Sequence, residues 1–114
     1  MPTLVKRTTL IVRSLDRSRD FYRDVLGLTV WYDDEIVLSG VGLAAGKAGD
    51  RTRLIILQAA DPVVGMIGLL QFTEPALPAP PRRDLLGIGD IVFVMQGDAV
   101  ASVHQRAVAF GSSI

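Results

Sequence analysis

The stretch that decides the fold is residues 7–28, RTTLIVRSLDRSRDFYRDVLGL, which reads as a strand, a turn, a helix and a glycine stop. Its β-branched and aliphatic start predicts a strand over residues 7–12, with successive side chains on opposite faces. Asp16 is placed to cap the helix, because its carboxylate can accept hydrogen bonds from the free N–H groups of the first turn. An apolar stripe of helical period follows, and Gly27 stands where the helix end needs a positive φ. The stripe comprises Phe21, Tyr22, Val25 and Leu26.

The same outline returns at residues 90–111, DIVFVMQGDAVASVHQRAVAFG. It predicts a strand over residues 91–95, Asp98 as a second helix cap, and Gly111 as a second stop. The helical stripe between them comprises Val100, Val103, His104, Ala107 and Val108. A unit that recurs once predicts a pseudo-symmetric fold of two related modules, since a solenoid needs more repeats.

Further strands are predicted at residues 28–32, 53–59 and 66–73, which gives the first module the order β-α-β-β-β. The nearly continuous apolar run of the middle strand predicts burial on both faces. Between the first two of these strands, Asp33, Asp34 and Glu35 are expected in a solvated turn, and residues 36–50 in a loop.

Residues 74–83, EPALPAPPRR, are rich in proline and cannot join a sheet interior, so they are expected to link two modules. The predicted domains are a first βαβββ module at residues 1–74, a proline-rich linker at 75–85, and the start of a second module, strand plus helix, at 86–114. A full second copy would add further strands after Gly111. We therefore expect either a chain truncated after residue 114 or strands supplied from elsewhere.

Composition excludes several classes of function. Twelve basic and twelve acidic residues give no net charge, so there is no electrostatic case for nucleic acid binding. No apolar run is long enough for a membrane span, and the N-terminus lacks the apolar core of a signal peptide, so a cytoplasmic protein is expected. The absence of cysteine excludes disulfides and thiolate chemistry. A mean hydropathy of +0.37 predicts surplus apolar surface that meets another chain.

Residues 15–28, LDRSRDFYRDVLGL, resemble the opening of the vicinal oxygen chelate superfamily, which includes glyoxalase I, bleomycin resistance proteins and extradiol dioxygenases. The βαβββ order, the proline-rich joint and the second start at GIGDIVFVM agree with it, so the resemblance covers about residues 4–111. It implies an α+β fold of paired βαβββ modules, here with the second module incomplete. It also implies a divalent metal in the cleft between two half-barrels.

The resemblance places the family's metal-ligand positions, usually His, Glu and His, on Arg7, Gln71 and Asp90. An arginine side chain has no lone pair for a metal and would repel a dication. A glutamine carbonyl is a weak neutral ligand, and Asp90 alone offers one hard donor group. His104, the only histidine, is expected to be a helix residue rather than a ligand. We therefore expect no metal and no other cofactor.

Two functions follow from this degenerate site. In the first, the chain binds a small molecule in the cleft: Arg7 takes a carboxylate or phosphate, Gln71 gives one hydrogen bond, and Trp31 or Tyr32 forms an apolar wall. Asp90 belongs to the same site, and a structural alternative pairs it with Arg7 across the module junction. The alternative function is a metal-dependent lyase, isomerase or dioxygenase of the same superfamily, for which no catalytic residue can be assigned.

The family's modules pair either within one chain or between two chains that exchange halves. The proline-rich segment has the length and stiffness of an exchange arm, so we expect a homodimer, with exchanged modules as one arrangement. The expected partners are therefore a small-molecule ligand and a second copy of the chain.

Overall fold

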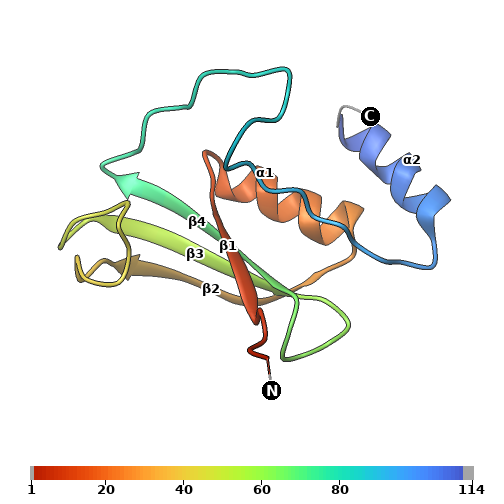
Figure 1. Cartoon of the computed structure of the whole chain (residues 1–114), viewed down its shortest axis with the longest axis horizontal. Coiled ribbons are helices and arrows are strands. Elements are labelled where there is room, and N and C mark those ends of the chain that lie inside the picture. The colour runs from red at the N-terminus through yellow and green to blue at the C-terminus, as the bar shows by residue number, and fades with distance from the viewer. Residues whose placement is uncertain (1, 112–114) are drawn as a thin grey trace.

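The computed structural model describes residues 2–111, and its element order is that of one βαβββ module followed by a C-terminal helix (Figure 1). This confirms the α+β class and the predicted order of the first module. No helix within these residues is long and apolar enough to cross a membrane. The elements are β1 (Arg7–Ile11), α1 (Leu15–Asp20), the π-helical turn η1 (Phe21–Val25), β2 (Thr29–Val37), β3 (Arg51–Gln58), β4 (Met66–Glu74) and α2 (Val100–Phe110).

The strands form one mixed sheet in the order β1-β4-β3-β2. β1 lies parallel to β4, whereas β4, β3 and β2 are antiparallel neighbours. The parallel pair is in register from Arg7 opposite Met66 to Ile11 opposite Leu70. β1 and β2 are consequently the two edge strands, and each has one edge without a neighbouring strand among the described residues.

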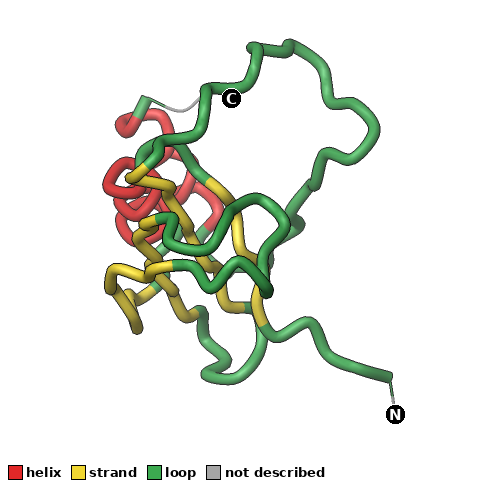
Figure 2. The backbone as a smooth tube through the Cα atoms, turned by 90° about the vertical axis from the view of Figure 1, so that its left-hand side faces the viewer, coloured by secondary structure: helices red, strands yellow, loops and turns green. Residues whose placement is uncertain are grey.

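The core lies between the sheet and the helices, which gather on one side of it (Figure 2). Its buried members are Leu15, Ile55, Leu57, Ile67 and Leu69. Each side chain of this size stabilises the fold by about 1.5–3 kcal/mol when fully buried. Ile56, which points to the opposite face of β3, is also buried, so the prediction of burial on both faces of this strand is confirmed.

The opposite face of the sheet, here called the open face, carries no helix among the described residues (Figure 2). Arg7 and Thr9 lie on it beside Gly68 of β4. A Cβ atom on Gly68 would lie 2.6 Å from Thr9 Oγ1 and 3.3 Å from Arg7 Cδ. The missing side chain therefore leaves room for the aliphatic stem of Arg7 against the sheet. Leu10, in contrast, packs against the helix-covered core, as the predicted alternation requires.

The N-cap of the first helix lies two residues before the predicted one. Ser14 is the N-cap, with extended φ and ψ of −130° and 105°, and its Oγ accepts a hydrogen bond from the Arg17 N–H at 3.4 Å. The prediction of Asp16 as cap was wrong, because this residue already lies inside the helix. Its carboxylate instead pairs with Arg19 at 3.1 Å and with Arg53 of β3 at 3.3 Å.

The acidic cluster is part of β2 and not a turn, so that prediction was wrong. Asp33 accepts two hydrogen bonds from the guanidinium of Arg53 on the adjacent strand, at 3.0 and 2.9 Å. Glu35 accepts one from Arg51 at 3.0 Å. These cross-strand pairs offset the low intrinsic strand preference of acidic residues. Residues 38–50 form a loop as predicted, whereas Ile36 and Val37, which were predicted to lie in it, belong to β2.

The C-terminal part, residues 75–111, is here called the C-terminal segment. Residues 91–95 form no strand: they run on without a hydrogen bond to any other residue within 2–111. Helix α2 does form, but its N-cap is Ala99 without a side-chain hydrogen bond, so the prediction of Asp98 as cap was wrong. Gly111 ends this helix with a φ of 97°, and Gly27 ends the first with 79°, which confirms both predicted stops.

Helix α2 docks on the helical layer of the first module (Figure 1). Arg106 Nε donates a hydrogen bond to the carbonyl oxygen of Val25 at 3.0 Å. The Phe110 ring meets the Phe21 ring edge-on at 5.6 Å, and the Arg17 guanidinium lies 4.5 Å from the centre of the same ring. Helix α2 is thus held by contacts with residues far from it in sequence, whereas residues 91–95, which lead to it, make no such hydrogen bond.

Candidate ligand-binding cleft

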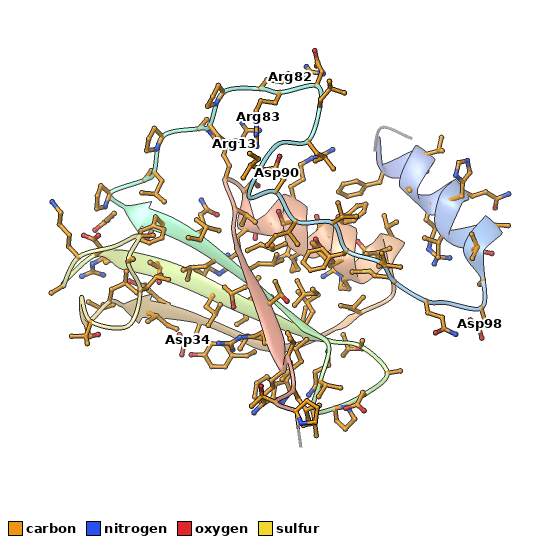
Figure 3. The ribbon with its side chains drawn as sticks, in the orientation of Figure 1. Arg13, Asp34, Arg82, Arg83, Asp90 and Asp98 are labelled. Carbon is orange, nitrogen blue, oxygen red and sulfur yellow. The ribbon has the colours of Figure 1, made fainter. Side chains whose placement is uncertain are left out.

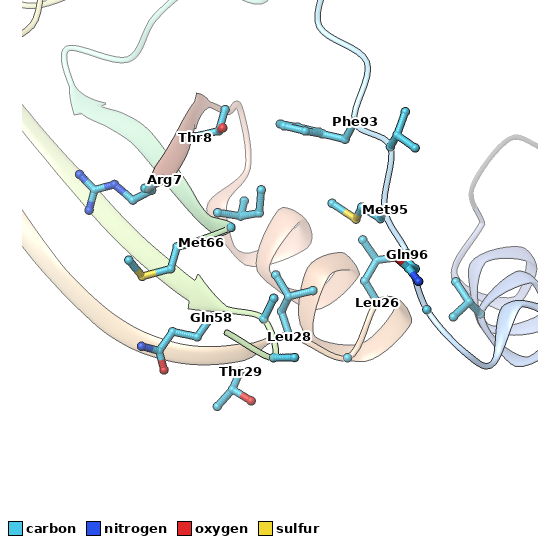
Figure 4. Close-up of a pocket in the computed structure, with 18 of the residues that line it drawn as sticks. Arg7, Thr8, Leu26, Leu28, Thr29, Gln58, Met66, Phe93, Met95 and Gln96 are labelled. Atoms are coloured by element: carbon cyan, nitrogen blue, oxygen red, sulfur yellow. The ribbon is translucent and has the colours of Figure 1, made fainter. Parts of the chain in front are cut away.

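A cavity of about 810 Å³ lies between the first module and the C-terminal segment (Figure 4). The first module contributes the ends of β1, β3 and β4 and the turn after η1, and the segment contributes residues 93–97 and the start of α2. Most of its side chains are apolar; those that matter below are Leu26, Leu28, Met66, Phe93 and Met95. A volume of this size falls within the range of small-molecule sites in proteins.

Among the described residues, Arg7 is the only charged one that lines this cavity. Its guanidinium makes no ion pair or hydrogen bond with another residue within 2–111. Figure 4 shows Arg7 and Gln58 on the side of the strands, with the Arg7 guanidinium directed away from Phe93 and Met95 on the facing segment. The cavity therefore combines an apolar interior with a cation at its margin, a surface suited to an amphipathic anion.

Gln71 was predicted to share a site with Arg7, but the two side chains lie on opposite faces of the sheet. The Gln71 Oε1 atom accepts a hydrogen bond from the backbone N–H of Leu15 at 2.8 Å. This is one of the free N–H groups at the start of α1, so the glutamine tethers the helix to β4. Its amide oxygen is thereby occupied inside the first module.

Asp90 lies in the loop before residues 91–95 and is bound locally (Figure 3). Its carboxylate accepts hydrogen bonds from the Gly87 N–H at 2.7 Å and from the Arg83 guanidinium at 2.6 Å. The Gly87 N–H, and after it the Arg83 side chain, lower the pKa of Asp90 below its usual value. The predicted ion pair between Arg7 and Asp90 is thus not formed, because Asp90 has a nearer cation.

Trp31 is 59% exposed on β2, with its ring 6.5 Å from that of Tyr32. It does not line the cavity. Of the four predicted site residues, the structure places only Arg7 there, so ligand roles for the other three stay predictions. The cavity residues that sequence reasoning missed are Gln58, Met66, Phe93 and Met95. From the sequence alone, Met66, Phe93 and Met95 could be identified only as residues of predicted strands.

The cavity does not fit the divalent metal that the fold family implies. Its one charged lining residue is a guanidinium, which cannot donate a lone pair to a metal. Within residues 2–111, no three His, Cys, Asp or Glu side chains gather closely enough to hold an ion. His104 is exposed on α2 and does not line the cavity, as the sequence predicted for a helix residue.

Comparison with known proteins identifies the class to which this fold belongs. Residues 4–111 match the Glyoxalase/Bleomycin resistance protein/Dioxygenase superfamily. The chain belongs to this family, and its βαβββ module with a mixed four-stranded sheet is the glyoxalase-like fold. Comparison with curated proteins gives no match.

Solved structures that are similar to this chain include the following two. A glyoxalase family protein from Bacillus cereus is 16% identical, with a TM-score of 0.74 over 97% of this chain and 74% of its own. A lactoylglutathione lyase from Agrobacterium tumefaciens is 24% identical, with a TM-score of 0.48 over 95% of this chain and 70% of its own. The first of these likenesses establishes the fold alone.

Proposed function

We propose that this chain binds a small molecule with an apolar body and one negatively charged group in the cavity beside Arg7, without a resident metal ion. The observation that carries the proposal is the lining: apolar side chains from both halves of the chain and a single guanidinium that no described residue pairs. A carboxylate, sulfonate or phosphate would supply the missing counter-charge.

The shape of the cavity supports an aromatic or branched body rather than a sugar. Met66, Phe93 and Met95 offer broad, polarisable surfaces, and Leu26 and Leu28 close the side next to η1. Gln58 and Gln96 are the amides among the lining residues, so few polar groups fix the orientation of the ligand.

A matched pair of fluorescent probes tests the charge requirement. 8-Anilinonaphthalene-1-sulfonate carries an apolar aromatic body and a sulfonate, whereas N-phenyl-1-naphthylamine carries the same body without the charge. We expect the substitution Arg7→Ala to weaken binding of the sulfonate probe by about tenfold, because a charge-assisted hydrogen bond contributes about 1.5–3 kcal/mol. Binding of the neutral probe should change by less than about twofold.

Arg82→Ala is the matched control, since Arg82 is an exposed arginine outside the cavity (Figure 3). It should leave both affinities unchanged. Equal binding of the sulfonate probe by wild type and the Arg7→Ala variant would overturn the proposal. A lower melting temperature of that variant with unchanged affinity would give Arg7 a structural role instead.

The alternative function, a metal-dependent lyase, isomerase or dioxygenase of the same superfamily, requires a metal as Lewis acid. Metal analysis of the purified protein separates the two. About one Ni, Zn, Fe or Mn per chain, removable by a chelator with loss of probe binding, would favour the enzyme over the metal-independent site.

We also propose that the chain works as a homodimer with exchanged C-terminal segments. This is supported by the concentration of exposed large apolar side chains in the C-terminal segment, which a second copy could cover. Sedimentation equilibrium at micromolar concentration tests it, and a monomer throughout that range would overturn it.

A further inference from the structure

One hydrogen bond joins the two elements that carry opposite walls of the cavity. Residues 26–28, which directly follow η1, line the wall of the first module. Val100 and Val103 of α2 line the wall of the C-terminal segment. Arg106 of α2 donates a hydrogen bond from Nε to the carbonyl oxygen of Val25, the last residue of η1, at 3.0 Å. Neither partner of this bond lines the cavity, so the bond acts on the walls and not on their contents.

The end of η1 needs a donor at this point. The last carbonyl groups of a helix have no partner within it. The N–H groups of residues 26–28 donate to three carbonyl oxygens of η1, at 3.0 to 3.3 Å. The Val25 carbonyl oxygen instead receives its hydrogen bond from α2. Arginine side chains commonly bind the final carbonyl groups of a helix in this way. Arg106 therefore completes the end of η1 from a position 81 residues further along the chain.

Of the anchors of α2, Arg106 is the one nearer to the cavity. It follows the lining residue Val103 by about 4.5 Å along the helix axis, at 1.5 Å per residue. Phe110, which contacts the Arg17 guanidinium, follows Val103 by about 10.5 Å on the same scale. Before α2, residues 91–95 make no hydrogen bond within residues 2–111. The position of the cavity end of α2 therefore depends mainly on Arg106.

We propose that Arg106 is a positioning residue of the ligand site, whose hydrogen bond to the Val25 carbonyl oxygen sets the distance between the two walls of the cavity. This inference rests on the proposed binding of a small molecule in the cavity, and it extends that site to a residue that does not touch the ligand. It does not rest on the proposed homodimer, because the bond joins the same two elements whichever copy supplies α2.

The distance between the walls matters because apolar contacts weaken quickly as two surfaces separate. A gap of about 0.5–1 Å removes about a quarter to a half of the dispersion attraction between them. Without the hydrogen bond, α2 occupies its docked position for a smaller fraction of the time, and the apparent affinity of a ligand falls with that fraction. The loss concerns the apolar body of the ligand, so a neutral ligand and an anionic one are affected alike. Arg7, in contrast, acts on the charge alone.

Titration with the sulfonate probe and with the neutral probe tests this role. Arg106→Met keeps an apolar stem and removes the donor. We expect it to weaken binding of both 8-anilinonaphthalene-1-sulfonate and N-phenyl-1-naphthylamine by about threefold to tenfold, the factor that corresponds to the net contribution of one hydrogen bond. Arg106→Lys should restore both affinities to within about twofold of wild type, because its ammonium group can donate to the same oxygen. Arg17→Ala, which removes a contact at the far end of α2, is the matched control and should leave both within about twofold.

A lower melting temperature of the Arg106→Met variant with both affinities unchanged would give Arg106 a structural role only and would overturn the inference. Equal weakening by Arg106→Met and Arg17→Ala would overturn it as well, since any loss of docking would then have the same effect. The proposed function is judged separately, by Arg7→Ala. If that variant bound the sulfonate probe as wild type does while Arg106→Met weakened both probes, the charge requirement would be wrong and the positioning role would stand. A wild-type protein that binds neither probe would overturn both.

Discussion

The first module and the C-terminal segment have similar apolar content, but the first buries its large apolar side chains and the second exposes many of them. Leu57 and Leu69 are fully buried in the first module, whereas Val94 and Ile88 in the segment are almost fully exposed. The difference is one of pairing. β3 and β4 have neighbours on both sides in the sheet, and residues 91–95 have none within 2–111. An apolar strand is therefore stable only where another strand satisfies its backbone.

The comparison also locates the cleft. The cavity lies where the two regions face each other, with the paired strands on one side and the unpaired segment on the other. A site built this way has one wall of paired strands and one wall whose position depends on the docking of α2.

Core truncation should separate the two regions most clearly. We expect Leu69→Ala to lower the free energy of unfolding by about 2–5 kcal/mol, because it leaves a cavity in the core. Ile88→Ala should change it by less than about 0.5 kcal/mol when chains are dilute enough to be single. Urea unfolding followed by Trp31 fluorescence measures both. An equal loss for the two variants in dilute solution would mean that the segment packs within one chain.

The next largest effect is expected from removing the ring contacts that anchor α2 on the first module. Phe110→Ala removes the ring contact with Phe21 and the guanidinium contact with Arg17, which together stabilise the docked helix by about 1–2 kcal/mol. We expect hydrogen exchange in residues 100–110 to accelerate by roughly five- to thirty-fold. Amides of β3 and β4 should be unaffected.

Val108→Ala, at an exposed position of the same helix, is the control for this change. If Phe110→Ala destabilised β3 and β4 as much as α2, the helix would be part of one cooperative unit with the first module. The distinction between a folded module and a docked segment would then be wrong.

Local signals explain what the sequence could predict. The strand at residues 7–12, the helix after it and both glycine stops are each determined by neighbours in sequence, and all are found in the structure. The place of Asp33 and Glu35 in β2 could not be predicted from their neighbours in sequence, because the arginines that pair with them belong to β3. The prediction of a strand at residues 91–95 was wrong for the same reason. A strand forms only where a second strand pairs with it, and the sequence does not say whether that partner is present.

The candidate site was predictable only at Arg7. Counting alternate residues places Gln71 on one face with Leu69, and this is correct, but sequence does not say which face carries the helices. The register of β1 against β4 puts Arg7 on the same face as Met66. Gln71 lies on the opposite face, where it accepts the hydrogen bond from the Leu15 N–H. Phe93 and Met95 reach the cavity through the docking of α2, which no local pattern encodes.

Gln71 itself provides a test of this reassignment. We expect Gln71→Ala to lower the free energy of unfolding by about 1 kcal/mol, because the Leu15 N–H loses its acceptor. Affinity for 8-anilinonaphthalene-1-sulfonate should stay within about twofold of wild type. Gln105→Ala on exposed α2 is the control. Loss of probe binding without loss of stability would return Gln71 to the ligand site.

The smallest effect concerns the charge pairs that hold the acidic cluster in β2. The hydrogen bond from Arg53 lowers the pKa of Asp33 below its usual value. A carboxyl group whose pKa is lower in the folded chain stabilises folding above its unfolded pKa of about 4. That stabilisation is lost as the pH falls through the folded value.

Asp33→Asn should therefore lower the free energy of unfolding by about 0.5 kcal/mol at neutral pH, a modest value because solvent screens this partly exposed pair. The difference from wild type should shrink as the pH drops below about 4 and in molar salt. Asp34→Asn, at a neighbour that forms no ion pair within residues 2–111, should show neither dependence. A deficit of the Asp33→Asn variant that persisted in acid would mean that β2 is held by packing and not by its cross-strand charges.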